Sequence, residues 1–126
     1  MRVLLTGLHG YVGSVTAEVL RAAGHDVDGL DTYFYEGCDL GPSGKNGSHA
    51  KVDVRDADRD MLRDVDAVVH LAALSNDPLG ALRPELTMEI NYQATEALAR
   101  AAREAGVKRF VFASSCSMYG AGGSDA

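Results

Sequence analysis

Three glycines at regular spacing form the first pattern in the chain that indicates chemistry. Gly7, Gly10 and Gly13 make a GxxGxxG directly after an apolar run. Glycine lets the backbone approach an anion closely, and the N-terminus of a following helix attracts negative charge. An ordinary glycine turn is the alternative for the bare pattern. Between a strand and a helix, the pattern predicts a site for the pyrophosphate of a dinucleotide.

An acidic residue follows the glycines at a spacing typical of dinucleotide-binding folds. Asp31 comes 18 positions after Gly13, close to the spacing at which a carboxylate accepts hydrogen bonds from the adenosine ribose. A 2′-phosphate beside Asp31 would be repelled, and Thr32 and Tyr33 follow it instead of a basic residue. A solvated turn aspartate is the alternative. In this context Asp31 predicts NAD as the cofactor.

Serine hydroxyls gather near the C-terminal end of the chain. Ser114, Ser115 and Ser117 follow the last apolar run, and open α/β sheets present reactive groups where their strands end. Taken alone, serines in such a place are more often turn formers than catalytic groups. A hydroxyl here is nevertheless a candidate to bind a substrate hydroxyl.

Other reactive residues make no recognisable site. No GxSxG surrounds the serines, and the four histidines stand at spacings that match no zinc motif. His70, within an apolar run, is expected to be a hydrogen-bonded core histidine. Cys38 and Cys116 form no CxxC pair, so reduced thiols are expected. The sequence predicts no metal site.

Hydrophobic periodicity supplies the elements that must position these residues. Predicted strands cover Arg2–Thr6, Val27–Asp31, Lys51–Val54, Ala67–Leu71 and Arg109–Ser114. Predicted helices cover Tyr11–Ala23, about two turns from Asp56, and Pro84–Ala105. This alternation predicts an α/β fold, a Rossmann-type doubly wound parallel sheet of five strands, in one domain over residues 1–126. Thr32–Ala50 and Gly120–Ala126 are expected to be loops.

Charge and length narrow the class of protein. The net charge is −6 and the basic residues are scattered, so neither nucleic acid nor a membrane surface is an expected partner. The apolar run near residue 4 is too short for a signal peptide or a transmembrane span. We expect a cytoplasmic protein.

Five blocks together resemble one family, the extended short-chain dehydrogenase/reductases, and within it the NAD-dependent nucleotide-sugar epimerases and dehydratases. The blocks are Thr6-Gly7-Leu8-His9-Gly10-Tyr11-Val12-Gly13, Asp53-Val54, His70-Leu71-Ala72-Ala73, Asn91, and Ser114-Ser115-Cys116-Ser117-Met118-Tyr119-Gly120. The resemblance covers the chain from Met1 to Gly120. It implies that NAD is contacted by Gly7, Gly10, Tyr11, Val12, Gly13, Asp31, Asp53, Val54, Leu71, Ala72 and Ala73.

The resemblance also implies a reaction. Members of this family act on a nucleotide-sugar through a transient keto-sugar, and Ser115 matches the family's catalytic serine or threonine. The family's base is the tyrosine of a YxxxK motif, and none of the five tyrosines is followed by a lysine four residues later. The last strands of the sheet and the C-terminal substrate-binding part are also missing. We therefore expect these 126 residues to bind NAD without completing catalysis.

Two other functions stay open at this point. One is a different NAD(P)-dependent ketone reductase of the same superfamily, and the other is a non-catalytic dinucleotide-binding module. A module should protect its final strand with polar residues, whereas Arg109–Ser114 is strongly apolar. The resemblance makes a homodimer plausible for an intact parent and doubtful for this chain. The sequence does not distinguish epimerase, dehydratase and reductase, and it does not identify the sugar.

Overall fold

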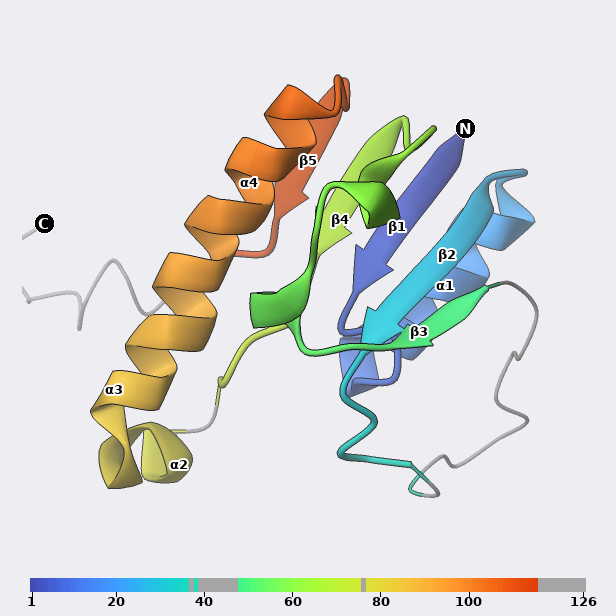
Figure 1. Ribbon diagram of the computed structural model, residues 1–126. Helices are drawn as coiled ribbons and strands as arrows, with labels where there is room; N and C mark the ends of the chain where they lie inside the picture. The colour runs from blue at the N-terminus through green and yellow to red at the C-terminus, as the bar shows by residue number, and fades with distance from the viewer. Residues whose placement is uncertain (37, 39–47, 76, 116–126) are drawn as a thin grey trace, which may run out of the picture.

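Five parallel strands form the centre of the computed structural model, which describes residues 1–36, 38, 48–75 and 77–115 (Figure 1). The strands are β1 (Arg2–Thr6), β2 (Asp26–Asp31), β3 (His49–Lys51), β4 (Ala67–His70) and β5 (Arg109–Phe112). Their order across the sheet is β3-β2-β1-β4-β5, and every pairing is parallel. The fold is therefore the predicted Rossmann-type α/β fold, with its reversal of strand order between β1 and β4.

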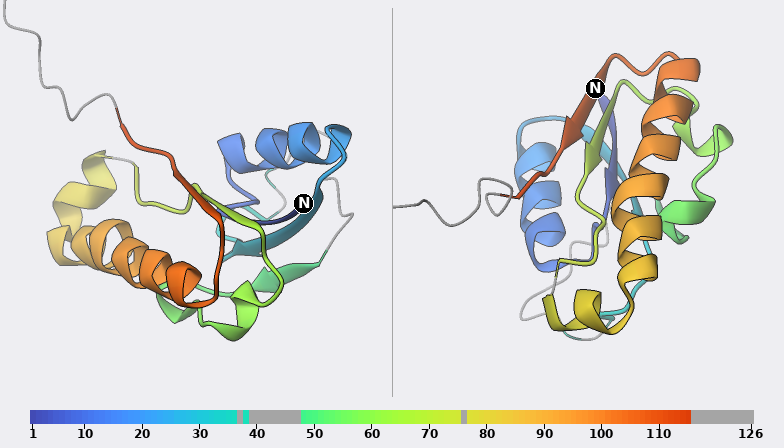
Figure 2. Two further views of the ribbon diagram at one scale, coloured as in Figure 1. Left: turned by 90° about the horizontal axis from the view of Figure 1, so that it is seen from above. Right: turned by 90° about the vertical axis from the view of Figure 1, so that its left-hand side faces the viewer.

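Helices cover the two faces of the sheet. Figure 2 shows α1 (Tyr11–Ala22) on one side and α4 (Ala94–Glu104) on the other. A π-helical segment, η3 (Met88–Gln93), joins α4 to α3 (Pro84–Thr87), and α2 (Asp77–Leu82) precedes them. The sequence predicted one helix over Pro84–Ala105, but the structure changes helix type within it and adds α2.

The larger core lies between the sheet and α4. Its buried residues are Leu4, Leu30, Val54, Leu62, Val65, Val68, Ala94, Leu98 and Ala102. The opposite face buries Leu5, Leu8, Ala17 and Val27 under α1. Burying each large aliphatic side chain stabilises the fold by roughly 1.5–3 kcal/mol. Neighbouring residues of β1 thus point into different cores, as the uninterrupted apolar run predicted.

The third strand was predicted with the wrong boundaries. β3 spans His49–Lys51 in place of Lys51–Val54, and Val54 begins a 3₁₀ turn, η1 (Val54–Asp56). The Asp53 carboxylate accepts a hydrogen bond from the Arg55 N–H, which stabilises a turn at this point.

The helix expected from Asp56 is also absent. A second 3₁₀ turn, η2 (Asp60–Leu62), stands in its place. Residues 55–60 are mostly charged, so they offer no apolar stripe that could hold a helix against the core. Leu62 and Val65 enter the core from turns instead.

Smaller differences concern the ends of the strands. β4 stops at His70 and β5 at Phe112, so Leu71 and Ser114 lie beyond the strands that were predicted to contain them. Parts of the expected loop Thr32–Ala50 and all of Gly120–Ala126 lie outside the described residues. Within the described part of the chain, no helix is long and apolar enough to cross a membrane.

Candidate functional site

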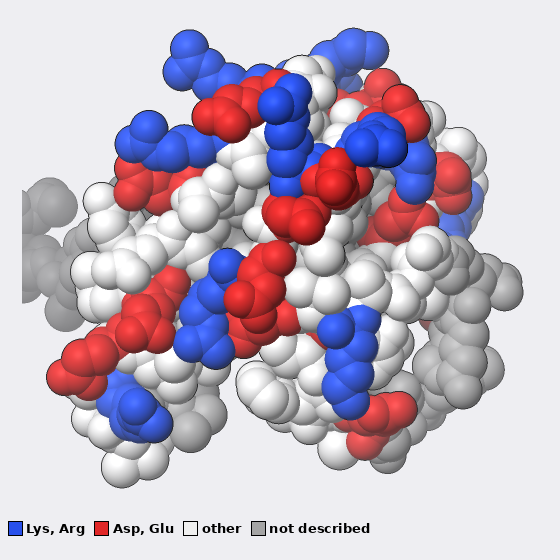
Figure 3. Space-filling view, viewed as in Figure 1, with Lys and Arg blue, Asp and Glu red and all other residues white. Residues whose placement is uncertain are grey.

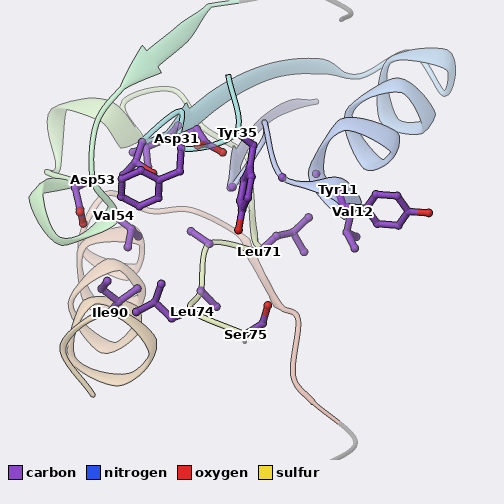
Figure 4. Close-up of a pocket in the computed structure, with 18 of the residues that line it drawn as sticks. Tyr11, Val12, Asp31, Tyr35, Asp53, Val54, Leu71, Leu74, Ser75 and Ile90 are labelled. Atoms are coloured by element: carbon purple, nitrogen blue, oxygen red, sulfur yellow. The ribbon is translucent and has the colours of Figure 1, made fainter. Parts of the chain in front are cut away.

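A pocket of about 370 Å³ opens where β1, β2 and β4 end. Its wall includes all eleven residues predicted to contact a dinucleotide: Gly7, Gly10, Tyr11, Val12, Gly13, Asp31, Asp53, Val54, Leu71, Ala72 and Ala73. Parallel strands end at the same edge of a sheet, so the fold brings together segments that are far apart in sequence. Figure 4 shows Asp31, Asp53 and Leu71 around the same space.

The first and third glycines of the turn are packed too tightly against backbone to carry a side chain. A Cβ atom on Gly13 would lie 2.0 Å from the Gly7 carbonyl oxygen. Gly7 itself has a φ of +74°, and a Cβ there would lie 2.9 Å from the backbone nitrogen of Ala72. The Gly10 N–H donates to the Gly7 carbonyl oxygen at 3.1 Å, which closes the turn. Backbone contact thus requires glycine at positions 7 and 13, whereas a Cβ atom on Gly10 would lie 3.2 Å from the Gly7 carbonyl oxygen, which is tight but less severe.

The N-terminus of α1 follows this turn directly. Its N-cap is Gly10, which provides no capping side chain, and the first turn of α1 contains no acidic residue. The first N–H groups of a helix have no partner within the helix and carry its positive dipole end. This end of α1 can therefore interact favourably with an anion in the pocket.

Asp31 ends β2 beside the glycine turn and is held by two backbone groups. Its Oδ2 accepts a hydrogen bond from the His9 N–H at 2.8 Å, and its Oδ1 accepts one from the Tyr33 N–H at 2.7 Å. A carboxylate oxygen can accept more than one hydrogen bond. Asp31 is thus fixed in orientation and can still accept from ligand hydroxyls.

Asp53 forms a hydrogen-bonded ion pair with Arg55. Arg55 donates from Nε to one carboxylate oxygen of Asp53 at 3.0 Å and from a terminal nitrogen to the other at 2.9 Å. These hydrogen bonds lower the pKa of Asp53 below its ordinary value. Arg55 also contacts Glu89 at 3.2 Å, and Figure 3 shows such mixed charges across this face. Asp53 keeps its charge, and the buried Val54 beside it adds apolar wall.

The loop after β4 is held by an amide on η3. Asn91 donates from Nδ2 to the Leu74 carbonyl oxygen and accepts at Oδ1 from the Leu74 N–H, both at 2.8 Å. Leu74 lines the pocket. Asn91 is one of the five blocks that carry the resemblance, and these two hydrogen bonds give it a structural role.

Sequence reasoning missed several residues of the wall: Leu30, Thr32, Phe34, Tyr35, Val52, Leu74, Ser75 and Ile90. Phe34 and Tyr35 are 76% and 61% exposed although aromatic. Two adjacent aromatics directly after the acidic residue were the available signal, but the whole segment was assigned to a loop. In Figure 4 the Tyr35 ring lies among the pocket residues, while Tyr11 points away from them.

The candidate catalytic serine lies elsewhere. Ser115 is exposed beyond the end of β5 and does not belong to the pocket wall. Cys116, Ser117, Met118, Tyr119 and Gly120 lie outside the described residues. No group of three or more potential metal-binding side chains occurs in the described ranges. The catalytic role of Ser115 stays a prediction.

The chain is similar in sequence to known proteins over nearly its whole length. The family model described as the NAD dependent epimerase/dehydratase family matches residues 3–126. The UDP-glucose 4-epimerase of Streptomyces lividans is 39% identical over 129 aligned positions, which cover 94% of this chain and 37% of that protein. A UDP-glucose 4-epimerase of Klebsiella pneumoniae is 35% identical, and the match covers 95% of this chain and 93% of that protein.

A solved structure extends the comparison to three dimensions. The UDP-glucose-4-epimerase of Stenotrophomonas maltophila, with bound NAD and formylated UDP-arabinopyranose, has a TM-score of 0.81 and 29% identity. The match covers 100% of this chain and 40% of that one. The chain thus spans well under half the length of the Streptomyces and Stenotrophomonas proteins.

Proposed function

Because the chain belongs to the NAD dependent epimerase/dehydratase family, we propose that its pocket binds NAD as the cofactor site of a nucleotide-sugar epimerase or dehydratase. One observation carries the proposal. A helix N-terminus without a capping side chain and a carboxylate held by backbone N–H groups face the same pocket. These are the two groups that recognise the pyrophosphate and the ribose of a dinucleotide.

The pocket fits the three parts of the adenosine diphosphate half. The glycines let the backbone of the turn close on itself, and the N-terminus of α1 that follows would face the pyrophosphate. Asp31 accepts hydrogen bonds from the ribose hydroxyls and repels a 2′-phosphate. Val54, Ile90 and Phe34 offer apolar surface to the adenine.

The reaction requires more than this pocket. When bound, NAD would supply hydride-transfer chemistry at the sugar. The resemblance implies that Ser115 hydrogen-bonds the reacting sugar hydroxyl while a tyrosine removes its proton. These 126 residues contain no YxxxK tyrosine. We propose that they supply the cofactor site of the reaction, which also needs a proton-accepting tyrosine and a substrate site.

Calorimetric titration of the 126-residue chain with NAD⁺ and NADP⁺ tests the proposal. We expect the chain to prefer NAD⁺, and Asp31→Ala to weaken NAD⁺ binding and reduce the preference. Asp26→Ala is the matched control, because Asp26 is an exposed aspartate at the opposite end of the same strand. A folded chain that binds neither dinucleotide would contradict the proposal, as would a preference that Asp31→Ala leaves unchanged.

A further inference from the structure

A buried histidine connects three elements of the fold. His70 ends β4 and is 1% exposed. Its Nδ1 lies 2.6 Å from the Thr6 hydroxyl oxygen, and its Nε2 lies 2.8 Å from the Thr95 hydroxyl oxygen. Both ring nitrogens are therefore hydrogen-bonded, one to β1 and the other to α4.

The partners of the two threonines fix the tautomer. Thr95 donates its hydroxyl hydrogen to the Asn91 carbonyl oxygen at 2.9 Å, so it accepts from His70 and Nε2 carries the proton. Nδ1 is then an acceptor, and the Thr6 hydroxyl donates to it. The ring is neutral, and hydrogen bonds run in one direction from Thr6 to Asn91.

The Thr6 hydroxyl oxygen also accepts from the pocket wall. The N–H groups of Leu71 and Ala72 point at it from 3.3 and 3.2 Å. The Ala72 backbone is the surface against which Gly7 packs. With its single hydrogen directed at His70, Thr6 presents its lone pairs to this loop. The orientation of one hydroxyl thus joins His70 to the glycine turn and to Leu71 and Ala72.

Protonation of His70 would reverse this arrangement. An imidazolium donates from both nitrogens, so three N–H groups would converge on the Thr6 oxygen and the threonine hydrogen would lose its acceptor. The ring is surrounded by the hydroxyls of Thr6 and Thr95 and by the rings of Phe110 and Phe112, at 6.0 and 5.9 Å. None of these groups is charged, and burial lowers the pKa of His70.

We propose that His70 is a positioning residue for the dinucleotide pocket: as the neutral Nε2–H tautomer it orients the Thr6 hydroxyl and the Leu71–Ala72 backbone, and its protonation weakens NAD binding. This inference rests on the proposed NAD site. It assigns a role to a side chain that does not line the pocket.

Two substitutions separate the two hydrogen bonds. In His70→Asn the side-chain oxygen can take the place of Nδ1 and accept from Thr6, whereas in His70→Gln the amide can take the place of Nε2 and donate to Thr95. For His70→Asn we expect an NAD⁺ affinity within about twofold of that of the unsubstituted chain. We expect a loss of about five- to tenfold for His70→Gln, equivalent to one hydrogen bond. Thr6→Val should weaken binding at least as much as His70→Gln.

The pH dependence provides a readout that a purely structural role would not move. Because burial lowers the pKa of His70, NAD⁺ affinity of the unsubstituted chain should fall only in acid below the ordinary histidine pKa of about 6.5, and His70→Asn should reduce that fall. His49, whose pKa is also lowered by burial, is present in both proteins, so the ratio of their affinities isolates His70. Equal losses in His70→Asn and His70→Gln, with an unchanged pH profile, would overturn the proposal.

The tautomer can be tested without ligand. In ¹⁵N NMR spectra of the chain at neutral pH, Nε2 of His70 should be protonated and Nδ1 should be an unprotonated acceptor. Protonation at Nδ1 would overturn the inference even if NAD binds. If the tautomer is as assigned but NAD⁺ binds at no pH, the proposed function has failed, and the role of His70 toward NAD fails with it.

Discussion

The side-chain amide of Asn91 pairs with both backbone polar groups of Leu74, donating to the carbonyl oxygen and accepting from the N–H at 2.8 Å each. Asn91 lies in the π-helical segment η3. Such a distortion is often found at functional sites. The pairing connects the helical layer to the pocket loop after β4. The wall of the pocket therefore depends on a residue that lies 78 positions after Gly13 in the sequence.

Removing this amide should destabilise the chain and loosen the loop. Asn91→Ala leaves two partly buried backbone groups of Leu74 without partners, which should cost about 2–3 kcal/mol of unfolding free energy. Asn91→Asp keeps the acceptor but sets a carboxylate oxygen against the Leu74 carbonyl oxygen, so it should destabilise the chain as well. Urea denaturation measures both, with the exposed Gln93→Ala as control. If Asn91→Ala were no more destabilising than Gln93→Ala, the pairing would not contribute to stability.

The glycine turn should tolerate no methyl group at its third glycine. Gly13→Ala places Cβ 2.0 Å from the Gly7 carbonyl oxygen, and backbone must move to relieve that contact. We expect the variant to lose more than about 3 kcal/mol of stability or to remain unfolded. Gly24→Ala is the control, because nothing lies within 4 Å of its Cβ and only its φ of +83° is unfavourable. It should lose about 1–2 kcal/mol. Similar losses in the two variants would contradict this account.

Stability should decrease in mild acid. Burial lowers the pKa of His49 and that of His70. Below about pH 6.5 the unfolded chain therefore binds more protons than the folded chain, and the free energy of unfolding falls with pH. His49→Gln should flatten the curve between about pH 7 and pH 5, and adding His70→Asn should flatten it further. A curve that both variants leave unchanged would show that these histidines do not cause the loss.

The last described strand should promote self-association. Val111 and Phe112 of β5 are 54% and 51% exposed, and β5 is the outermost of the described strands on its side of the sheet. An exposed apolar edge strand favours pairing with another chain, and lysine on such a strand opposes it. We expect Val111→Lys to reduce concentration-dependent light scattering. Arg109→Lys, which keeps the charge on the same strand, should have no effect, and equal scattering by both variants would exclude this edge as the cause.

Ser115 should matter for turnover and not for the cofactor. In an intact parent enzyme, Ser115→Ala should lower kcat by about 10²–10⁴-fold, because a hydroxyl that bonds the reacting group acts mainly in the transition state. NAD⁺ affinity should stay unchanged, since Ser115 does not line the pocket. Steady-state kinetics and calorimetry measure the two quantities. Unchanged kcat would remove Ser115 from the proposed mechanism.

Local patterns determined most of the fold and the position of the pocket. The apolar run at Val3–Leu5 and the glycine spacing after it predicted β1, the turn and α1, because burial on both faces and close backbone approach leave few other residue types acceptable. Asp31 was identifiable for the same reason, since its distance from Gly13 is set by one helix and one strand. These features depend on residues close in sequence.

Tertiary structure decided the features that depend on distant partners. Val54 was expected in a strand, but its neighbour Asp53 caps a turn and bonds Arg55. The π-helical segment accompanies a pairing between Asn91 and Leu74, 17 positions apart. The His70 contacts join three elements. Periodicity reports only which residues are buried, whereas hydrogen-bond partners across the fold determine how a buried or turn residue is held.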